Sequence, residues 1–296
     1  MTDMPQTILT ATDFSKPAER ACDFARDLSR RFQAQLHLLH VVVIFEDPHL
    51  EEDHLHRLEE LVASGNDARL RDLENGSEVQ PGLDVTPHMV RGLAPAEVIV
   101  ETASNLRCEL IVMGTHGRRG LPHLLLGSVA ERVVRTSTVP VLTVRGDADT
   151  KLEGTPKILV PHDFSEASAA AVRCAAVWAD ALGAEITLLH VVEPVVYPEF
   201  YSVDVISDDL MERLVERSER ALGTAAKDLL GKARTTVEVG RAANTIVDFA
   251  DPERFDLVIM ATRGLSAIEH ALLGSVAESV LRRCRVPLLA VPASSF

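Results

Sequence analysis

Glycine, serine and histidine residues recur after the fourth apolar segment of the chain at a spacing that suits phosphate binding. Gly114 begins a Gly-Thr-His-Gly block that ends at Gly117, and nine residues separate this block from Gly127 and Ser128. Glycines allow the backbone to approach a ligand closely and to adopt positive φ. The N–H groups at the start of a helix attract anions, because they lack partners within the helix and lie at the positive end of its dipole. This G-x-x-G-x9-G-S spacing before a helical pattern favours a phosphate site.

Other interpretations of these residues stay open. Ser128 and Glu131 also match a capping box, which needs no ligand, and the pair of glycines is also typical of a tight turn. The sequence contains neither a G-x-x-x-x-G-K-[ST] loop nor a G-x-G-x-x-G fingerprint after its first apolar segment. Asp13, and Asp163 at the matching place in the second half, are either acceptors for a base or ribose or helix N-caps.

The histidines indicate no metal site. His40 and His190 lie inside apolar segments, which predicts buried imidazoles with hydrogen-bond partners. His49, His54 and His56 are close in sequence, but His54 and His56 point to different sides of a helix, which favours solvent-exposed side chains over metal ligands. No nucleophile–base pair or close pair of carboxylates recurs, so we predict no catalytic residue.

The two halves of the chain repeat one another, which indicates two copies of one domain. Asp-Phe-Ser at 13–15 and Leu-Leu-His-Val-Val at 38–42 recur 150 positions later, at 163–165 and 188–192. Gly-Ser-Val-Ala-Glu at 127–131 recurs 147 positions later, at 274–278. A polar stretch with flanking glycines lies between the copies. We therefore expect a first domain at 1–147, a linker at 148–154 and a second domain at 155–296.

The elements that must position these residues are short apolar strands alternating with amphipathic helices, which is typical of a parallel sheet covered on both faces. Ligands bind such sheets at the carboxyl ends of the strands, where the strand order reverses. The last strands are apolar edges that need covering, so we expect the halves to pack through them as a pseudo-two-fold pair. The predicted strands are Thr7–Thr12, Leu36–Val43, Leu83–Val90, Glu109–Gly114 and Val139–Val144, then Lys157–Pro161, Glu185–Val192, Thr235–Val239, Leu257–Ala261 and Pro287–Val291. The predicted helices of the first half are Pro17–Phe32, Glu51–Glu74, Pro95–Asn105 and Ser128–Thr136.

Composition narrows the class of protein. The 296 residues include 30 Lys and Arg against 44 Asp and Glu, a net charge of −14. Such a chain lacks the basic surface with which proteins bind nucleic acids or anionic membranes. Its four cysteines form no C-x-x-C pair, which indicates reduced thiols, and its start shows no signal-peptide pattern. We expect a cytoplasmic α/β protein with neither nucleic-acid nor membrane partners.

These motifs together resemble the universal stress protein family. The resemblance rests on the Gly-Thr-His-Gly and Gly-Ser-Val-Ala-Glu blocks, on Val-Pro-Val-Leu-Thr-Val at 139–144, and on the Thr-Asp-Phe-Ser and Leu-Leu-His-Val-Val segments. It covers essentially the whole chain as two tandem domains of the ATP-binding type. It implies two flavodoxin-like (adenine nucleotide alpha hydrolase-like) domains, each a five-stranded parallel sheet of order 3-2-1-4-5.

The resemblance also implies which residues hold a nucleotide. Asp13 and the backbone of Val41 would meet the adenine, whereas Gly114, His116 and Gly117 would run beside the ribose and α-phosphate. Gly127, Ser128 and Val129 would bind the outer phosphates. Ala261 stands where the second motif should begin with glycine, so the first half is expected to bind ATP more tightly. The matching residues of the second half are Asp163, Val191, Arg263, Gly264, Gly274, Ser275 and Val276.

The implied function is that of an adenine-nucleotide-binding stress-response protein acting as a non-catalytic regulator or scaffold. Its cofactor would be ATP, ADP or AMP, with Mg²⁺ on the phosphates. Two alternatives stay open: a slow Mg²⁺-dependent ATPase that uses the same pocket, and an interaction module whose nucleotide sites are vestigial. The partners implied are client proteins, the other half of the chain in an intramolecular pseudo-dimer, and a second copy in a homodimer.

Overall fold

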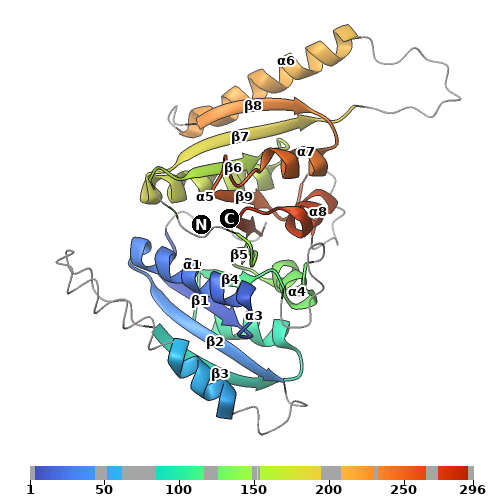
Figure 1. The fold of residues 1–296 in the computed structure, drawn as a ribbon. Helices are drawn as coiled ribbons and strands as arrows, with labels where there is room; N and C mark the ends of the chain where they lie inside the picture. The colour runs from blue at the N-terminus through green and yellow to red at the C-terminus, as the bar shows by residue number, and fades with distance from the viewer. Residues whose placement is uncertain are drawn as a thin grey trace, which may run out of the picture.

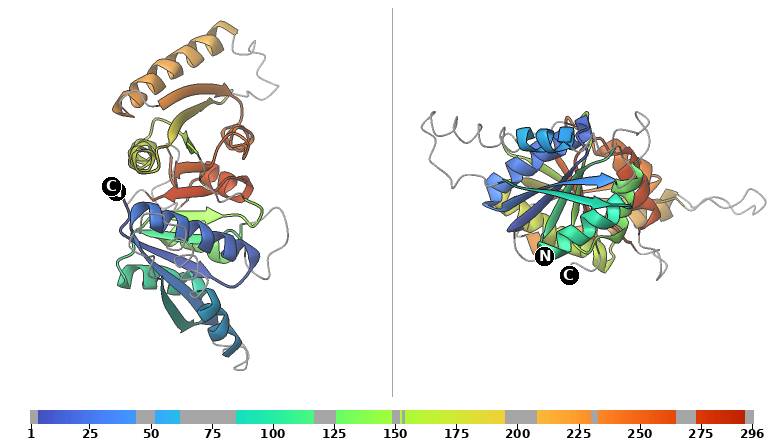
Figure 2. Two further views of the ribbon diagram at one scale, coloured as in Figure 1. Left: turned by 60° about the vertical axis from the view of Figure 1, so that its left-hand side comes forward. Right: turned by 90° about the horizontal axis from the view of Figure 1, so that it is seen from below.

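The computed structural model describes residues 4–43, 52–61, 85–116, 126–148, 152, 154–194, 208–229, 233–264 and 273–292. In this part of the chain a ten-stranded sheet runs from β8 at one end to β3 at the other, with helices on both faces (Figures 1 and 2). The first half contains β1 (Thr7–Thr12), α1 (Lys16–Phe32), β2 (Gln35–Val43), a helix over 52–61, β3 (Val85–Gly92), α3 (Pro95–Asn105), β4 (Leu110–Gly114), α4 (Ser128–Thr136) and β5 (Val141–Val144). The second half contains β6 (Lys157–Pro161), α5 (Glu166–Leu182), β7 (Glu185–Val192), α6 (Asp208–Ala225), the 3₁₀ helix η1 (Ala226–Leu229), β8 (Ala233–Val239), α7 (Ala242–Phe249), β9 (Leu257–Ala261), α8 (Ser275–Arg283) and β10 (Leu288–Val291).

Each half has the strand order that the sequence predicts. The order is β3-β2-β1-β4-β5 in the first half and β8-β7-β6-β9-β10 in the second, which is 3-2-1-4-5 twice. The pairs within each half are parallel. The order reverses between β1 and β4, and between β6 and β9, so a ligand site is expected beside each of these pairs. The predicted fold class, two tandem doubly wound α/β units, is confirmed.

The last strands of the two halves join the two half-sheets. β5 and β10 pair in antiparallel fashion, with Leu142 opposite Leu289. The hydroxyl of Thr143 adds a hydrogen bond of 3.3 Å to the carbonyl of Leu288. This pairing covers both apolar edge strands, which would otherwise expose unpaired backbone groups.

The apolar cores on both faces of the sheet continue across this junction. One core lies under α1 and α5, and the other lies under α3, α4, α7 and α8. In the first core, the ring of Phe32 from α1 meets the edge of Trp178 from α5, with centroids 5.2 Å apart. Phe32 is 7% exposed and Trp178 is 1% exposed. Ala148 and Leu152, from the predicted linker, are buried in the same core, so at these positions the junction packs against the domains.

Local sequence signals explain where the elements begin and end. Helix α1 starts at an N-cap, Ser15, whose side chain accepts a hydrogen bond from the Ala18 N–H, and it ends at Gln33 in the left-handed conformation. The structure differs from the prediction at β5, which begins at Val141 rather than Val139. The N–H of Val139 donates to the hydroxyl of Ser137 (3.1 Å), and Pro140 has no N–H to offer the sheet. The segments predicted at 62–74 and 83–84 lie outside the described residues.

Candidate functional site

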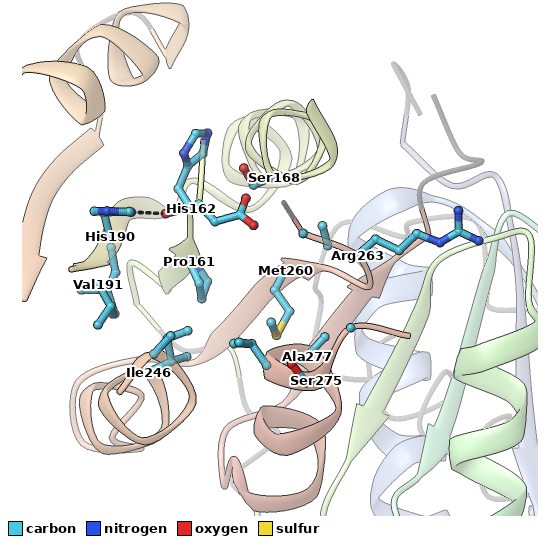
Figure 3. Close-up of a pocket in the computed structure, with 17 residues that line it drawn as sticks. Pro161, His162, Ser168, His190, Val191, Ile246, Met260, Arg263, Ser275 and Ala277 are labelled. Carbon is cyan, nitrogen blue, oxygen red and sulfur yellow. Dashed lines mark hydrogen bonds between the residues drawn. The ribbon is translucent and has the colours of Figure 1, made fainter. Parts of the chain in front are cut away.

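An open pocket lies at the carboxyl ends of β6, β7 and β9 in the second half, at the predicted point of strand-order reversal (Figure 3). Its volume is about 680 Å³ with the open mouth included. It contains every residue that the resemblance implies for this half. The lining is Pro161, His162, Asp163, Ser168, Leu189, His190, Val191, Ala242, Ile246, Met260, Ala261, Arg263, Gly264, Gly274, Ser275, Val276 and Ala277.

The wall of this pocket is partly apolar. Figure 3 shows Val191, Ile246 and Met260 around the cavity, whereas the side chain of Arg263 points away from them. Sequence reasoning missed Ile246 and Met260. Met260 has the same period-two parity as Val258 within β9, a signal that places both on one face of the sheet. Ile246 could not be found in this way, because only the packing of α7 against β7 brings it to the pocket.

Helix α8 begins at the pocket without a side-chain cap, and α4 does the same in the first half. The N-cap residues are Gly274 and Gly127, and no side chain in the described part of the chain caps either helix. Their own N–H groups donate to the carbonyls of Thr262 (2.8 Å) and Thr115 (2.7 Å). The capping-box interpretation is therefore wrong: Ser128 is the first helical residue rather than the cap. The N–H groups that follow each glycine lie at the positive end of a helix dipole.

Both aspartates hold the turn that precedes the next helix. Oδ1 of Asp163 accepts hydrogen bonds from the N–H (3.0 Å) and the hydroxyl (2.5 Å) of Ser165. Asp13 receives the same pair from Ser15, at 3.1 and 2.6 Å. The alternative that the aspartates are N-caps is wrong, since Ser15 and Ser165 are the N-caps. The aspartates instead fix these serines, so each carboxylate has a defined orientation beside the site.

The glycines serve close approach rather than positive φ. A side chain at Gly264 would overlap the Asp163 carboxylate, so glycine is needed there. Among the described glycines, positive φ occurs at Gly154 and Gly183, not in the motif. Of the two properties of glycine named above, positive φ is therefore not used by the motif residues that the structure describes. Gly117 lies outside the described residues.

Glycine at position 114 is explained by close packing against the start of α1 rather than by close approach to a ligand. A methyl group there would lie 2.8 Å from the backbone carbon of Pro17 and 2.9 Å from the N atom of Ala18, at the start of α1. Its counterpart Ala261 is 7% exposed and belongs to the core under α5. Ala261 also lines the pocket, so its effect on nucleotide binding stays a prediction.

The described residues of the first site come together in the same way. The hydroxyl oxygen of Ser15, after β1, donates its proton to Asp13 and lies 3.4 Å from the carbonyl oxygen of His116, after β4. Nδ1 of His116 lies 2.9 Å from the Thr115 hydroxyl, and its Nε2 is buried without a partner in the described structure. Burial, and then the positive charge of Arg145, lower the pKa of His116 below its ordinary value. A neutral imidazole therefore stands in this loop at pH 7.

Other histidines are structural. His40 is 3% exposed and its Nδ1 donates to the Thr12 carbonyl at 2.9 Å, which confirms the predicted buried imidazole. His54 is 1% exposed and its Nδ1 lies 3.2 Å from Nε2 of His40, so the expectation of a solvent-exposed His54 is wrong. Exposed His56 pairs with Glu60 instead. His49 lies outside the described residues. Within the described ranges, no three His, Cys, Asp or Glu side chains are grouped to hold a metal ion, and no helix could span a membrane.

The fold defines a tandem doubly wound α/β protein, with a pocket at the strand-order reversal of its second half. The family model of the universal stress protein family matches residues 4–145 and again residues 154–292. The chain therefore belongs to the universal stress protein family, in a tandem form.

Individual relatives agree with this assignment. A universal stress protein of Methanocaldococcus jannaschii is 34% identical over 139 residues, which cover 47% of this chain and 81% of the relative. A universal stress protein of Mycobacterium tuberculosis is 28% identical over 197 residues, or 66% of this chain and 65% of the relative. The crystal structure of a universal stress protein from Archaeoglobus fulgidus covers 98% of this chain and 97% of its own, with a TM-score of 0.65 and 21% identity. At 21% identity, this last similarity shows a shared fold only.

Proposed function

We propose that this protein binds adenine nucleotides and acts in the stress response as a non-catalytic regulator or scaffold. The observation that carries the proposal is the pocket of the second half, in which the uncapped start of α8 faces an apolar wall. An adenine nucleotide combines a flat apolar base with phosphates. The residues fit both parts, since Val191, Ile246 and Met260 offer apolar surface and the N–H groups at the start of α8 offer donors to an anion.

Each residue group has a proposed role. Asp163 and the backbone of Val191 meet the adenine, and the loop of Arg263 and Gly264 runs beside the ribose and first phosphate. Gly274, Ser275 and Val276 hold the outer phosphates. The first half uses the matching residues, with Mg²⁺ on the phosphates in both sites: Asp13, Val41, Gly114, His116, Gly117, Gly127, Ser128 and Val129.

The proposal extends to the organisation of the chain. We propose that the domains are residues 1–147 and 155–296, joined by a linker at 148–154. The pairing of β5 with β10 supports the proposal that they form an intramolecular pseudo-dimer. A homodimer, client proteins and a cytoplasmic location complete the proposal. Nucleotide occupancy would act on clients through the helices that begin at the two sites.

The nucleotide content of the purified protein tests this function. Denatured protein should release ATP, ADP or AMP, and the full chain stripped of nucleotide should rebind it. Incubation with Mg²⁺ and ATP should release no more phosphate than a Ser128→Ala variant does. Excess phosphate release would support the ATPase alternative, and failure of the stripped chain to rebind nucleotide would support vestigial sites.

A further inference from the structure

The end of α8 lies beside the first turn of α4, so the second half contacts the helix that begins at the first site. Nη2 of Arg282, in the last turn of α8, donates to Oε2 of Glu131 at 2.9 Å. Glu131 belongs to the first turn of α4, which begins at Ser128. The two helices thus meet tail to head across the junction of the halves.

A cleft opens at this junction, and arginines from both halves line it. Its volume is about 980 Å³ with the open mouth included. We call Arg145, Arg283 and Arg285 the seam arginines. Guanidinium groups bind phosphate oxygens through paired hydrogen bonds, and several of them around one cavity favour an anionic ligand. The cleft is lined by Arg145, Asp147, Val247, Asp248, Ala250, Asp251, Pro252, Arg283 and Arg285.

Arg145 connects this cleft to the first site. It is nine-tenths buried, and its Nε donates to Oδ1 of Asp147 at 3.1 Å. Its charge contributes to the lowered pKa of His116 in the loop of the first site. The charges of Arg145 and Arg285 also lower the pKa of Asp147, against the opposing effect of burial. Arg145 therefore lies within electrostatic reach of both His116 and Asp147, and Arg285 lies within reach of Asp147.

The seam arginines have no charged counterparts at the second site. The repeat relates this part of the two halves by an offset of 147 positions. At that offset, the positions matching Arg145, Arg283 and Arg285 hold uncharged residues: Pro292, Thr136 and Thr138. The duplicated fold thus carries an unequal pair of sites.

Carboxylates in the same cleft refine the choice of ligand. Asp147, Asp248 and Asp251 face the seam arginines, and Oδ1 of Asp251 also accepts the N–H of Glu253 at 2.9 Å. Three carboxylates offset three guanidinium charges. A phosphate chain that carries a divalent cation suits such a mixed lining better than a bare anion, because both of its charges find partners.

We propose that Arg283 and Arg285 of the second half, with Arg145, complete the first site and make it select nucleotides with a polyphosphate tail. This inference rests on the proposed nucleotide binding. The second site, which lacks such arginines, discriminates less between ATP and AMP.

The test uses the full chain with the double substitution Arg283→Ala and Arg285→Ala, since both side chains are exposed. The matched control is Arg217→Ala with Arg220→Ala, exposed arginines of α6 at the far end of the sheet (Figure 1). Both variants change the net charge equally. Calorimetric titration with Mg²⁺-ATP should show one site weakened roughly tenfold in the seam variant, as expected for two exposed charge contacts. AMP affinity should match that of the wild type, and the control should bind both normally.

Each of the other outcomes would either overturn or support the proposal. Equal ATP affinity in the seam variant and the control overturns the proposal and leaves nucleotide binding intact. Equal losses of affinity for ATP and AMP also overturn it, because the arginines would then not distinguish the polyphosphate tail of ATP from the single phosphate of AMP. If the wild type binds no adenine nucleotide, the proposed function fails. Titration with inorganic tripolyphosphate and Mg²⁺ then tests whether the seam arginines bind a polyphosphate. Binding that is lost in the seam variant alone then supports an anion site, and no binding by the wild type overturns it.

Discussion

Substituting Gly264 by alanine should weaken nucleotide binding in the second half without unfolding the protein. A methyl group at Gly264 would overlap Oδ2 of Asp163. That carboxylate cannot swing away freely, because its Oδ1 already accepts two hydrogen bonds from Ser165, at 3.0 and 2.5 Å. The loop after β9 must therefore move instead. Gly264 has no positive φ, so the cost comes from this contact rather than from backbone strain.

The magnitude follows from the contacts that a displaced loop gives up. A ligand that loses one hydrogen bond to a buried site loses about 1–3 kcal/mol, which corresponds to roughly 5- to 150-fold in affinity. Calorimetric titration with ATP should show one of two binding steps weakened within this range. Gly223→Ala is the matched control, since a methyl group at Gly223 would meet nothing within 4 Å. Two unchanged binding steps in Gly264→Ala, with normal thermal unfolding, would refute the reasoning.

The opposite substitution, Ala261→Gly, separates packing from ligand binding. Ala261 lines the pocket, but it is 7% exposed and packs in the core under α5, so we expect removal of its methyl group to leave ATP affinity unchanged. Stability should fall by about 1 kcal/mol, from the lost burial and the greater freedom of glycine in the unfolded chain. Tighter ATP binding by this variant in calorimetry would show instead that the methyl group crowds the nucleotide.

Three further predictions concern the scaffold. Cys22 is buried and its pKa is raised to about 11, chiefly by burial, so it and the other three buried thiols should resist alkylation until urea unfolds the chain; rapid labelling of native protein would contradict this. Burial lowers the pKa of His37 and that of His88, and the charge of His88 lowers the pKa of His37 further, so the unfolded chain binds their protons more readily. The contribution of this pair to the free energy of unfolding should therefore be fully present above the ordinary pKa of 6.5 and decrease as the pH drops below it. Glutamine at both positions should reduce the loss measured by urea unfolding between about pH 7.5 and about pH 5.5, whereas an unchanged loss would exclude the pair as its source. Phe32→Ala should lower the free energy of unfolding by about 3–5 kcal/mol and shift the fluorescence of Trp178, the single tryptophan, to the red. An unchanged spectrum would contradict the contact between Phe32 and Trp178.

Much of the fold follows from local patterns, because the strands are apolar and end at recognisable turns. The predicted strand Thr7–Thr12 and helix Pro95–Asn105 coincide with β1 and α3. The repeat also indicates which strands meet, since the same apolar edge occurs at the end of each half. Errors at strand ends, such as the late start of β5 at Val141, reflect side chains like Ser137 that take a backbone N–H from the sheet.

The missing part of the site depends on contacts that are distant in the sequence. His54 was expected at the surface because His54 and His56 point to different sides of a helix, but tertiary packing buries His54 against His40. The seam arginines belong to no motif, and the antiparallel pairing of β5 with β10 brings those of the second half beside Arg145 of the first. Sequence spacing therefore predicts where each proposed phosphate site lies, whereas the proposed difference between the two sites comes from packing between the halves.

Equilibrium dialysis of the nucleotide-free full chain against labelled ATP and Mg²⁺ tests the central claim most directly. Each half presents an uncapped helix start at a switch point of its sheet, at Gly127 and at Gly274. We therefore expect saturable binding that approaches two ATP molecules per chain. An isotherm without a saturable component at millimolar ATP would contradict the account.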